Sequence, residues 1–281
     1  MTTVKAYAKV NLSLFITGIR NNGYHLLDTV MHSISLYDTV TVDKGLNENI
    51  TVTCSNAQIS GENNICHKAA VLFFNETKIK GGAKINIVKS IPLAAGLGGG
   101  SADAAAVLKG LNREFGCPLN EEALLKLALR LGADVPFCVK GGSARVMGIG
   151  EELIPFLNKL PLYMVLIKED EKPSTAVMYK ELDEKMQGIY AESTVPRLCS
   201  ALENGDYDTF INCLYNDFSA LWDFNSIRKA LLLNGADGAC LSGSGPMVMG
   251  FFRNKAAALK AYETLKDNYR SIYFAESVVN E

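Results

Sequence analysis

A glycine cluster that leads directly into a run of small residues is the strongest constraint that this sequence places on its fold. Residues 92–102 are PLAAGLGGGSA, and DAAAVL follows at once. Glycine lets backbone N–H groups approach a ligand without a Cβ in the way, and it adopts φ > 0 without steric cost. A helix that opens after Gly100 has unpaired N–H groups and partial positive charge at its start. The junction therefore predicts a phosphate-binding loop.

Two well-known phosphate loops do not fit this segment. A P-loop ends in G-K-[ST], but no lysine follows these glycines before Lys109. The dinucleotide fingerprint G-x-G-x-x-G matches Gly96 and Gly98 but meets a serine at its third position. Its ribose-binding acid would be Glu121 or Glu122, which open a helix instead of ending a strand. A glycine-rich corner without any ligand is the alternative interpretation.

The composition indicates a globular protein without a nucleic-acid partner. The chain has 281 residues, is 48% hydrophobic, and carries a formal charge of −2 from 28 basic and 30 acidic residues. Proteins that bind nucleic acids usually show a clear basic excess, which is missing here. The chain exceeds the usual size of a single core, so one large or two medium domains are expected.

The cysteines and histidines predict neither a disulfide framework nor a zinc site. The seven cysteines include no C-x-x-C pair, and the three histidines are not at metal-ligand spacing. Scattered thiols of this kind are typical of a reducing compartment. The first residues contain no apolar leader, and no apolar stretch approaches the ~20 residues of a membrane span. We therefore expect a cytoplasmic protein without a membrane partner.

The order of the predicted elements favours an α+β protein with two domains. Residues 4–17 alternate apolar and polar side chains, which is the period of a strand with one face in the core. The other predicted elements are strands at 27–36, 38–42, 49–54 and 84–89 and helices at 63–76, 101–115 and 121–131. The last of these helices has Asn120 as N-cap, Gly132 as stop, and an apolar stripe of Leu124, Leu125, Leu127, Leu129 and Leu131. The segment LNKLPLY suggests a boundary, which gives domains 1–157 and 158–281.

Four sequence blocks resemble those of the GHMP kinases. P-x-x-x-G-L-G-G-G-S at 92–101 resembles their ATP-binding loop, and LSGSGP at 241–246 resembles their third motif. AKVNLSLFITGIRNNGYHLLDTVM (8–31) and LGADVPFCVKGG (131–142) are similar to the amino-terminal and catalytic-aspartate segments of the members that act on a cytidylylated substrate. The blocks span nearly the whole chain in the family's order. Ala102 departs from the second serine that the family usually carries, which removes one hydroxyl that could contact phosphate or magnesium.

The resemblance implies a two-domain GHMP kinase fold with ATP and substrate in the cleft between the domains. The amino-terminal domain would be like the second domain of ribosomal protein S5, and the carboxy-terminal domain would be an antiparallel sheet with helices. The implied reaction moves the γ-phosphoryl group of ATP to the 2-hydroxyl of a cytidine-diphosphate methylerythritol in isoprenoid precursor synthesis. Magnesium is expected with ATP, although its protein ligands are not identified. We expect a monomer or a weak homodimer.

The resemblance assigns the catalytic roles to Asp134 and Lys9. An alcohol is a poor nucleophile, so a base must accept its proton as the phosphoryl group arrives. Asp134 would be that base and Lys9 its cationic partner. Lys9 lies on the polar face of the first strand, and Asp134 precedes Val135-Pro136, where we expect extended backbone. From the residues alone, Asp134 could be a turn or cap residue and Lys9 a solvated strand lysine.

The resemblance also assigns the binding residues. ATP contacts are expected at Asn63, Lys89, Pro92, Leu93, Ala94, Ala95, Gly96, Leu97, Gly98, Gly99, Gly100, Ser101 and Ala102. Contacts to the acceptor substrate are expected at Asn11, Tyr24, His25, Thr175 and Tyr179, with a tyrosine ring over the cytosine. From the residues alone, Tyr179 could be ordinary core, His25 a hairpin residue, Asn63 a helix N-cap and LSGSGP only a turn.

Two other functions fit parts of the sequence. The first is another small-alcohol GHMP kinase, acting on mevalonate or homoserine; neither substrate has a base for Tyr179 and the NNGYH segment to hold. The second is a non-catalytic nucleotide-binding or RNA-binding module on a similar fold. The near-neutral charge and the presence of both Lys9 and Asp134 argue against it.

Overall fold

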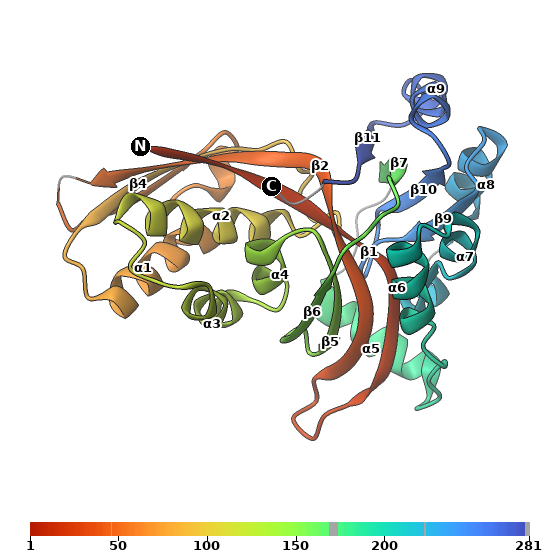
Figure 1. Cartoon of the computed structure of the whole chain (residues 1–281), viewed down its shortest axis with the longest axis horizontal. Helices are drawn as coiled ribbons and strands as arrows, with labels where there is room; N and C mark the ends of the chain where they lie inside the picture. Colours follow the sequence, from red (N-terminus) through yellow and green to blue (C-terminus); the bar gives the residue numbers. More distant parts are fainter. Residues whose placement is uncertain (46, 169–173, 222, 279–281) are drawn as a thin grey trace. The chain divides into compact units, whose positions relative to one another are not determined.

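The computed structural model describes residues 1–45, 47–168, 174–221 and 223–278 (Figure 1). The chain forms two compact units. The first comprises Met1–Lys9, Leu36–Leu93 and Gly98–Gly141, and the second comprises Val10–Ser35, Ala94–Leu97 and Gly142–Glu281. The two longest strands, β1 (Thr2–Ile19) and β2 (His25–Gly45), contribute residues to both units. The predicted domain boundary after residue 157 stays a prediction.

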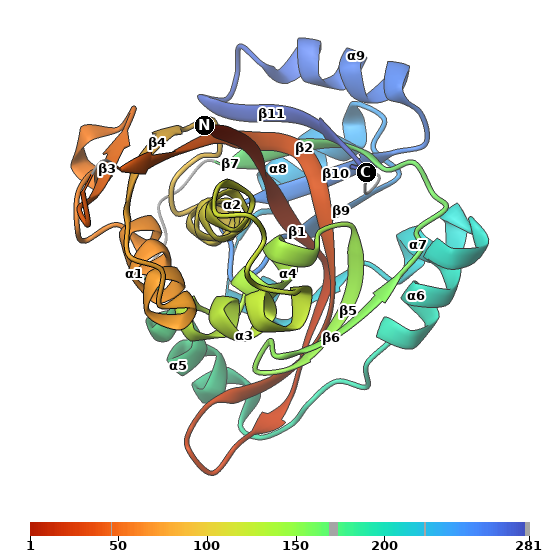
Figure 2. The ribbon, with the colours of Figure 1, turned by 60° about the vertical axis from the view of Figure 1, so that its left-hand side comes forward.

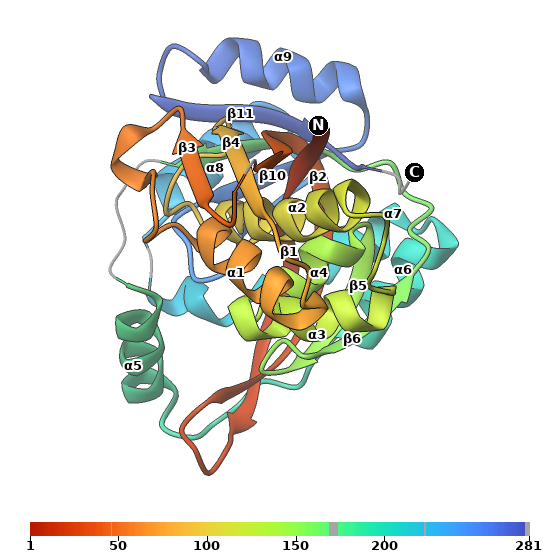
Figure 3. The same cartoon turned by 90° about the vertical axis from the view of Figure 1, so that its left-hand side faces the viewer.

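Four helices of the first unit lie on one face of its strands (Figures 1 and 3). Strand β4 is antiparallel to β2, with Val42 opposite Ile85, and β3 is parallel to β4. Besides parts of β1 and β2, the elements are β3 (Ile50–Cys54), a 3-10 turn (Ala57–Ile59), α1 (Ile65–Thr77), β4 (Gly82–Val88), α2 (Gly99–Glu114), α3 (Glu121–Leu131) and α4 (Val135–Lys140).

Small residues let α2 approach the strands beneath it. Ala104, Ala105 and Ala106 are fully or almost fully buried in this helix. At Gly110, an added Cβ would lie only 2.8 Å from Cγ2 of Val42, so the helix axis could not come this close with a larger residue. The small residues of α2 therefore set the distance between this helix and the sheet.

The second unit contains the rest of β1 and β2 and most of the carboxy-terminal elements. Strand β5 is antiparallel to β2, with Thr29 opposite Val146, and β8 is parallel to β1, with Ser13 opposite Tyr215. The elements are β5 (Ser143–Gly148), β6 (Glu152–Phe156), β7 (Tyr163–Lys168), α5 (Thr175–Met186), α6 (Val195–Asn204), α7 (Tyr207–Asn212), β8 (Tyr215–Asn216), a 3-10 helix (Asp217–Leu221), α8 (Asn225–Leu233), β9 (Gly238–Leu241), β10 (Val248–Phe252), α9 (Lys255–Leu265) and β11 (Ser271–Glu276).

The second unit also contains a separate antiparallel sheet with strand order β11–β7–β10–β9, whose central strands β7 and β10 are buried on both faces. Helix α9 lies beside β11 (Figure 2). In β10, Gly250 leaves room for Leu231 of α8, because a Cβ there would lie 2.8 Å from Cδ2 of Leu231. The next side chain, Phe251, faces the opposite way, and its ring meets that of Phe210 of α7 edge to face at 5.1 Å. Burial on both faces explains why VMGFF is apolar without alternation.

Most predicted elements are confirmed, and two details are wrong. The α+β class, the first strand, the helix between Asn120 and Gly132, and the strands around LSGSGP are all present. The segments 27–36 and 38–42 belong to one strand, β2, instead of two. The apolar stripe of α3 is narrower than predicted, because Leu129 is 43% exposed and the buried residues are Leu124, Leu127 and Ala128. Among the described residues, no helix is long and apolar enough to cross a membrane.

Candidate active site

The glycine loop, residues 92–102, ends where α2 begins. Gly98 occupies the N-cap position with φ 67° and ψ 22°, a left-handed conformation that glycine adopts without strain. The helix starts at Gly99, and the amide of Ala102 donates to the carbonyl of Gly98 at 2.8 Å. The amides before Ala102 belong to the first turn, where a helix has no internal acceptors to offer them. This start of α2 can therefore bind an anion such as a phosphate group.

The predicted catalytic pair, Lys9 and Asp134, is brought together beside Gly98. The Nζ atom of Lys9 lies 3.3 Å from Oδ2 of Asp134. The Lys9 side chain is only 6% exposed, whereas that of Asp134 is 32% exposed and so accessible to a substrate. A Cβ on Gly98 would lie 2.9 Å from Cγ of Lys9, which means that the lysine stem packs against the glycine. Within the first unit, the start of α2 and the Lys9–Asp134 pair are thus neighbours.

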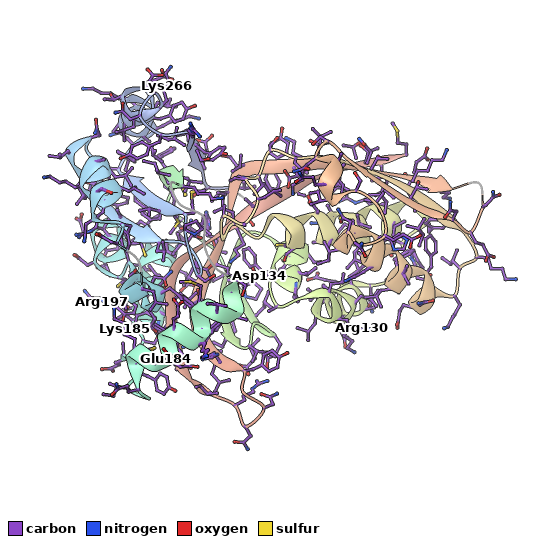
Figure 4. All side chains as sticks on the ribbon, turned by 180° about the vertical axis from the view of Figure 1, so that it is seen from behind. Arg130, Asp134, Glu184, Lys185, Arg197 and Lys266 are labelled. Carbon is purple, nitrogen blue, oxygen red and sulfur yellow. The ribbon has the colours of Figure 1, made fainter. Side chains whose placement is uncertain are left out.

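Asp134 occupies a cap position without making a cap bond. It is the N-cap residue of α4 and is labelled in Figure 4, yet its side chain accepts no hydrogen bond from the first turn of that helix. Its backbone has φ −81° and ψ −18°, so the predicted extended conformation is wrong. Pro136 lies in the first helical turn, where its missing N–H costs nothing, and the helix therefore begins before the proline. The carboxylate is directed to Lys9 instead of to its own helix.

Lys89 is held by two buried carboxylates. Its Nζ donates to Oδ2 of Asp103 at 2.7 Å and also to Oδ2 of Asp38. The other oxygen of Asp38 accepts from the amides of Ser90 at 2.5 Å and Ile91 at 2.8 Å, directly before the glycine loop. Sequence reasoning missed both aspartates, because no spacing in the sequence links them to Lys89. The adenosine contact expected for Lys89 stays a prediction.

The third-motif loop, residues 241–246, lies against the middle of the glycine loop. Gly96 has φ 77°, and a Cβ there would lie 2.7 Å from the carbonyl oxygen of Ser242 and 3.1 Å from that of Gly245. The Oγ of Ser242 accepts from the backbone amide of Asn11 at 3.3 Å, and the Asn11 side chain donates to Oγ1 of Thr29 at 2.9 Å. LSGSGP is therefore more than a turn between two strands.

A buried asparagine that sequence reasoning missed fixes the third-motif loop. Nδ2 of Asn216 donates to the carbonyl oxygens of Leu241 and Gly243, both at 2.8 Å. Its Oδ1 accepts from the amide of Phe218 at 2.9 Å, so both N–H donors and the carbonyl oxygen of this 3%-exposed side chain have backbone partners. The signal in the sequence is weak, because an isolated Asn before an Asp in YNDF resembles any loop.

Two of the predicted substrate-binding residues stack on each other. The rings of His25 and Tyr179 are 4.3 Å apart with an interplanar angle of 26°. Nε2 of His25 lies 2.7 Å from Oδ1 of Asp183, and the Tyr179 ring meets Phe218 edge to face at 5.0 Å. His25 and Tyr179 are far apart in sequence, so the fold has brought together two residues that only the resemblance connected.

The remaining predicted residues are placed differently. Oγ1 of Thr175 lies 3.4 Å from Oγ of Ser244, next to the third-motif loop. Tyr24 is 60% exposed in the β1–β2 turn and is not part of the His25 stack. Asn63 is exposed, and the N-cap of α1 is its neighbour Asn64, whose side chain accepts from the amide of Cys66 at 2.8 Å. The cap role considered for Asn63 is therefore wrong, and its ATP contact stays a prediction.

The other residues of the glycine loop divide into exposed and buried positions. Leu93 is 44% exposed, and Ala94 adopts a left-handed backbone with φ 51°. Ala95 and Leu97 are buried, as is Ala102 in the first turn of α2. A serine at position 102 would therefore bring its hydroxyl into the packed side of the helix. Among the described residues, no group of three or more His, Cys, Asp or Glu could hold a metal ion.

Comparisons with known proteins identify relatives across the whole chain. Residues 64–142 match the model of the GHMP kinase N-terminal domain, and residues 200–271 match that of the GHMP kinase C-terminal domain. The chain is 38% identical over 286 residues to a 4-diphosphocytidyl-2-C-methyl-D-erythritol kinase of Clostridium perfringens, covering 98% of each protein.

Solved structures have the same fold. A crystal structure of 4-(cytidine 5'-diphospho)-2C-methyl-D-erythritol kinase matches with a TM-score of 0.82 and 29% identity, covering 99% of this chain and 100% of that one. The L. major mevalonate kinase in complex with R-mevalonate matches with a TM-score of 0.75 over 99% of this chain and 96% of that one. At 18% identity, this second likeness concerns the fold alone.

Proposed function

The chain belongs to the GHMP kinase family, and we propose that it transfers the γ-phosphoryl group of ATP to the 2-hydroxyl of 4-diphosphocytidyl-2-C-methyl-D-erythritol. Relatives with this substrate in their names match it from end to end, including a solved structure. The single observation that carries the chemistry is the Lys9–Asp134 pair, 3.3 Å apart and packed against Gly98 of the glycine loop. The reaction would supply a phosphorylated intermediate for isoprenoid precursors.

Asp134 is the general base in this proposal. Its carboxylate accepts the proton of the 2-hydroxyl while that oxygen forms a bond to the γ-phosphorus and the bond to the β–γ bridging oxygen breaks, which leaves ADP. Lys9, fixed by Gly98 on one side and Asp134 on the other, places a positive charge beside the transferring group. Positioned acid–base help of this kind is typically worth ~10²–10⁴ in rate.

The first turn of α2 would hold the phosphates. Its amides at Gly99, Gly100 and Ser101 point out of the helix start, where the dipole adds partial positive charge. Magnesium, when bound with ATP, neutralises charge on the phosphate oxygens. Such ions keep several waters and are held largely by the phosphates of the nucleotide, with few protein ligands.

The second unit would bind the acceptor. We propose that the stacked His25 and Tyr179 rings hold the cytosine and that Asn11 and Thr175 contact the rest of the substrate. Tyr179→Ala is expected to raise KM for the acceptor about tenfold or more while KM for ATP changes little, because stacking on an aromatic ring is worth ~1–3 kcal/mol per base. Steady-state kinetics with each substrate varied in turn measures both constants. Equal increases in the two would contradict a stacking role.

A substrate panel tests the proposed reaction against its nearest rivals. Purified enzyme with ATP and magnesium is offered 4-diphosphocytidyl-2-C-methyl-D-erythritol, methylerythritol phosphate, mevalonate or homoserine, and ADP release and the phosphorylated product are measured. We expect rapid turnover of the first compound, with product phosphorylated at the 2-hydroxyl, and little of the others. Preference for mevalonate or homoserine would replace the proposed substrate, and no turnover of any would favour a non-catalytic nucleotide-binding role.

A further inference from the structure

Three ionisable side chains meet inside the first unit next to the start of α2. The side chains of Asp38, Asp103 and Lys89 are 0%, 4% and 9% exposed. The Nζ atom of Lys89 lies 3.5 Å from the place that a Cβ would take on Gly99, the first residue of the helix. We call these three residues the Lys89 cluster. Whatever charge the cluster carries therefore acts on the turn proposed to hold the phosphates.

The hydrogen bonds within the cluster leave one carboxyl oxygen unused. Lys89 donates to one oxygen of each aspartate, and the second oxygen of Asp38 accepts from the Ser90 and Ile91 amides. Among the described residues, Oδ1 of Asp103 has no hydrogen-bond partner although it is buried. An ionised carboxylate with a buried and unpaired oxygen is costly, and protonation removes the part of that cost that comes from the charge.

The charges around the cluster do not neutralise the second carboxylate. Two thiols on other helices, Cys66 on α1 and Cys138 on α4, interact electrostatically with Asp103, and burial raises the pKa of both, that of Cys138 to about 12, so they stay uncharged. Burial lowers the pKa of Lys89, but Asp103 and Asp38 together raise it further, which keeps the ammonium charged. The cluster therefore holds one positive charge against two acids.

The titration of Asp103 lies close to neutrality. Burial raises the pKa of Asp103 to about 7; Lys89 opposes this shift and the Asp38 carboxylate adds to it. With Asp103 protonated, the cluster has no net charge. With Asp103 ionised, a net charge of −1 lies beside the first turn of α2, where it opposes the binding of a phosphate group.

We propose that Asp103 is a positioning residue for the nucleotide: its carboxyl group takes up a proton when the phosphates bind, so that the Lys89 cluster is neutral beside the loop in the bound state. This inference rests on the proposed function, because it takes the start of α2 as the phosphate site. By thermodynamic linkage the effect is reciprocal. Protonation of Asp103 strengthens nucleotide binding by some factor, and the bound nucleotide raises the proton affinity of Asp103 by the same factor. Affinity should thus fall above neutral pH, by at most about tenfold per pH unit.

Calorimetry of Mg-ADP binding tests the proposal without requiring catalysis. Titrations at pH 8 in buffers of different ionisation enthalpy give the number of protons exchanged on binding, and titrations from pH 6 to pH 9 give the change in Kd. We expect wild-type enzyme to take up about half a proton or more at pH 8. The Asp103→Asn variant keeps the shape of the side chain but cannot take up this proton. Its proton uptake should fall to the number of protons that the nucleotide alone exchanges, and its Kd should rise less steeply with pH than that of the wild type.

Asp28→Asn is the matched control. Asp28 is also a buried aspartate in an ion pair, with Oδ1 2.8 Å from Nε of Arg145, but it lies in the second unit. Its variant should retain the wild-type proton uptake. Equal proton uptake in wild type and Asp103→Asn would overturn this inference but not the proposed function. The absence of proton uptake by the wild type would do the same, and that measurement does not depend on the folding of a variant. Failure of the wild type to bind Mg-ADP would overturn the proposed function and this inference with it.

Discussion

Gly98 has two structural roles, one in the conformation of the glycine loop and one in the packing of Lys9. The left-handed backbone, with φ 67°, turns the loop into α2. The missing side chain leaves space for the Lys9 stem, whose Cγ and Cε would lie 2.9 Å and 3.2 Å from a Cβ. The same glycine thus shapes the turn that is proposed to bind phosphate and sets the position of the lysine that contacts Asp134.

Gly98→Ala is therefore expected to impair catalysis beyond its effect on stability. A Cβ must displace Lys9 and also strains a positive φ, so we expect kcat to fall at least about tenfold, since such a loss needs only about 1.4 kcal/mol in the barrier. Steady-state kinetics and thermal unfolding measure the two effects. The control is Gly116→Ala, at the other end of α2, where φ is 82° but an added Cβ meets nothing within 4 Å.

The control separates strain from displacement of the lysine. Gly116→Ala should lower the melting temperature through backbone strain alone and leave kcat unchanged. If Gly98→Ala is as active as wild type, or if both variants lose activity equally, the contact between Gly98 and Lys9 has no catalytic role.

Among the elements, the third-motif loop depends most on residues distant in sequence. Asn216 holds it through carbonyls 25 and 27 positions further along the chain. Asn216→Asp keeps the shape, removes both donors and places a carboxylate against two carbonyl oxygens. Leaving buried acceptors unpaired costs about 1–3 kcal/mol, so the melting temperature should fall and kcat/KM should drop roughly tenfold.

The control for Asn216 is the same substitution at an exposed site. Nδ2 of Asn204 donates to Oγ of Ser200 at 3.2 Å on an exposed part of α6. Asn204→Asp places a charge at the end of that helix, so it should lower the melting temperature only slightly and leave kcat/KM unchanged. Wild-type kinetics and stability in Asn216→Asp would show that the third-motif loop does not need this side chain.

Periodic and local signals made many elements predictable from the sequence. Alternation over 4–17 predicts β1, and the caps Asn120 and Gly132 predict α3, because these signals act within a few residues. The length of β2 was not predictable, because Asp38 within it is a buried acid whose partner, Lys89, lies 51 positions away. Local patterns cannot distinguish such a strand position from a turn.

The same limit applies to the candidate site. Lys9 and Asp134 were identified by resemblance, and their contact of 3.3 Å confirms only that the fold brings them together; their roles stay predictions. Asp103 and Asn216 were missed, because the reasons for them are contacts of the folded chain. The family and the kinase class predicted from the four blocks are confirmed by relatives that match over 98% of the chain.

At the scale of the whole molecule, a buried histidine makes the free energy of unfolding depend on pH. His32 of β2 is 1% exposed, and its Nδ1 lies 2.7 Å from Oγ of Ser143 on the paired strand β5. Burial lowers the pKa of His32 to about 4. The unfolded ring, with a pKa near ~6.5, is protonated at pH values where the folded ring is neutral, so unfolding takes up a proton between these limits.

The free energy of unfolding should consequently fall as the pH is lowered from about 6.5 to about 4. His32 should account for a loss of about 3 kcal/mol at the acid end of this range and for no loss above pH 6.5. Denaturant titrations across this range measure it. His32→Gln should remove this part of the slope, and His67→Gln, which leaves the buried ring in place, should retain it. A slope that is equal in wild type and His32→Gln would contradict the prediction.

The most direct test of the central claim is a rapid-quench measurement of a single turnover. Enzyme in excess over γ-labelled ATP, with saturating magnesium and 4-diphosphocytidyl-2-C-methyl-D-erythritol, reports the rate of phosphoryl transfer itself. We predict that Asp134→Asn slows this step at least ~100-fold with ATP affinity intact, whereas Asp206→Asn, the same change at the N-cap of α7, transfers at the wild-type rate. Transfer by Asp134→Asn at the rate of the wild type would contradict the account.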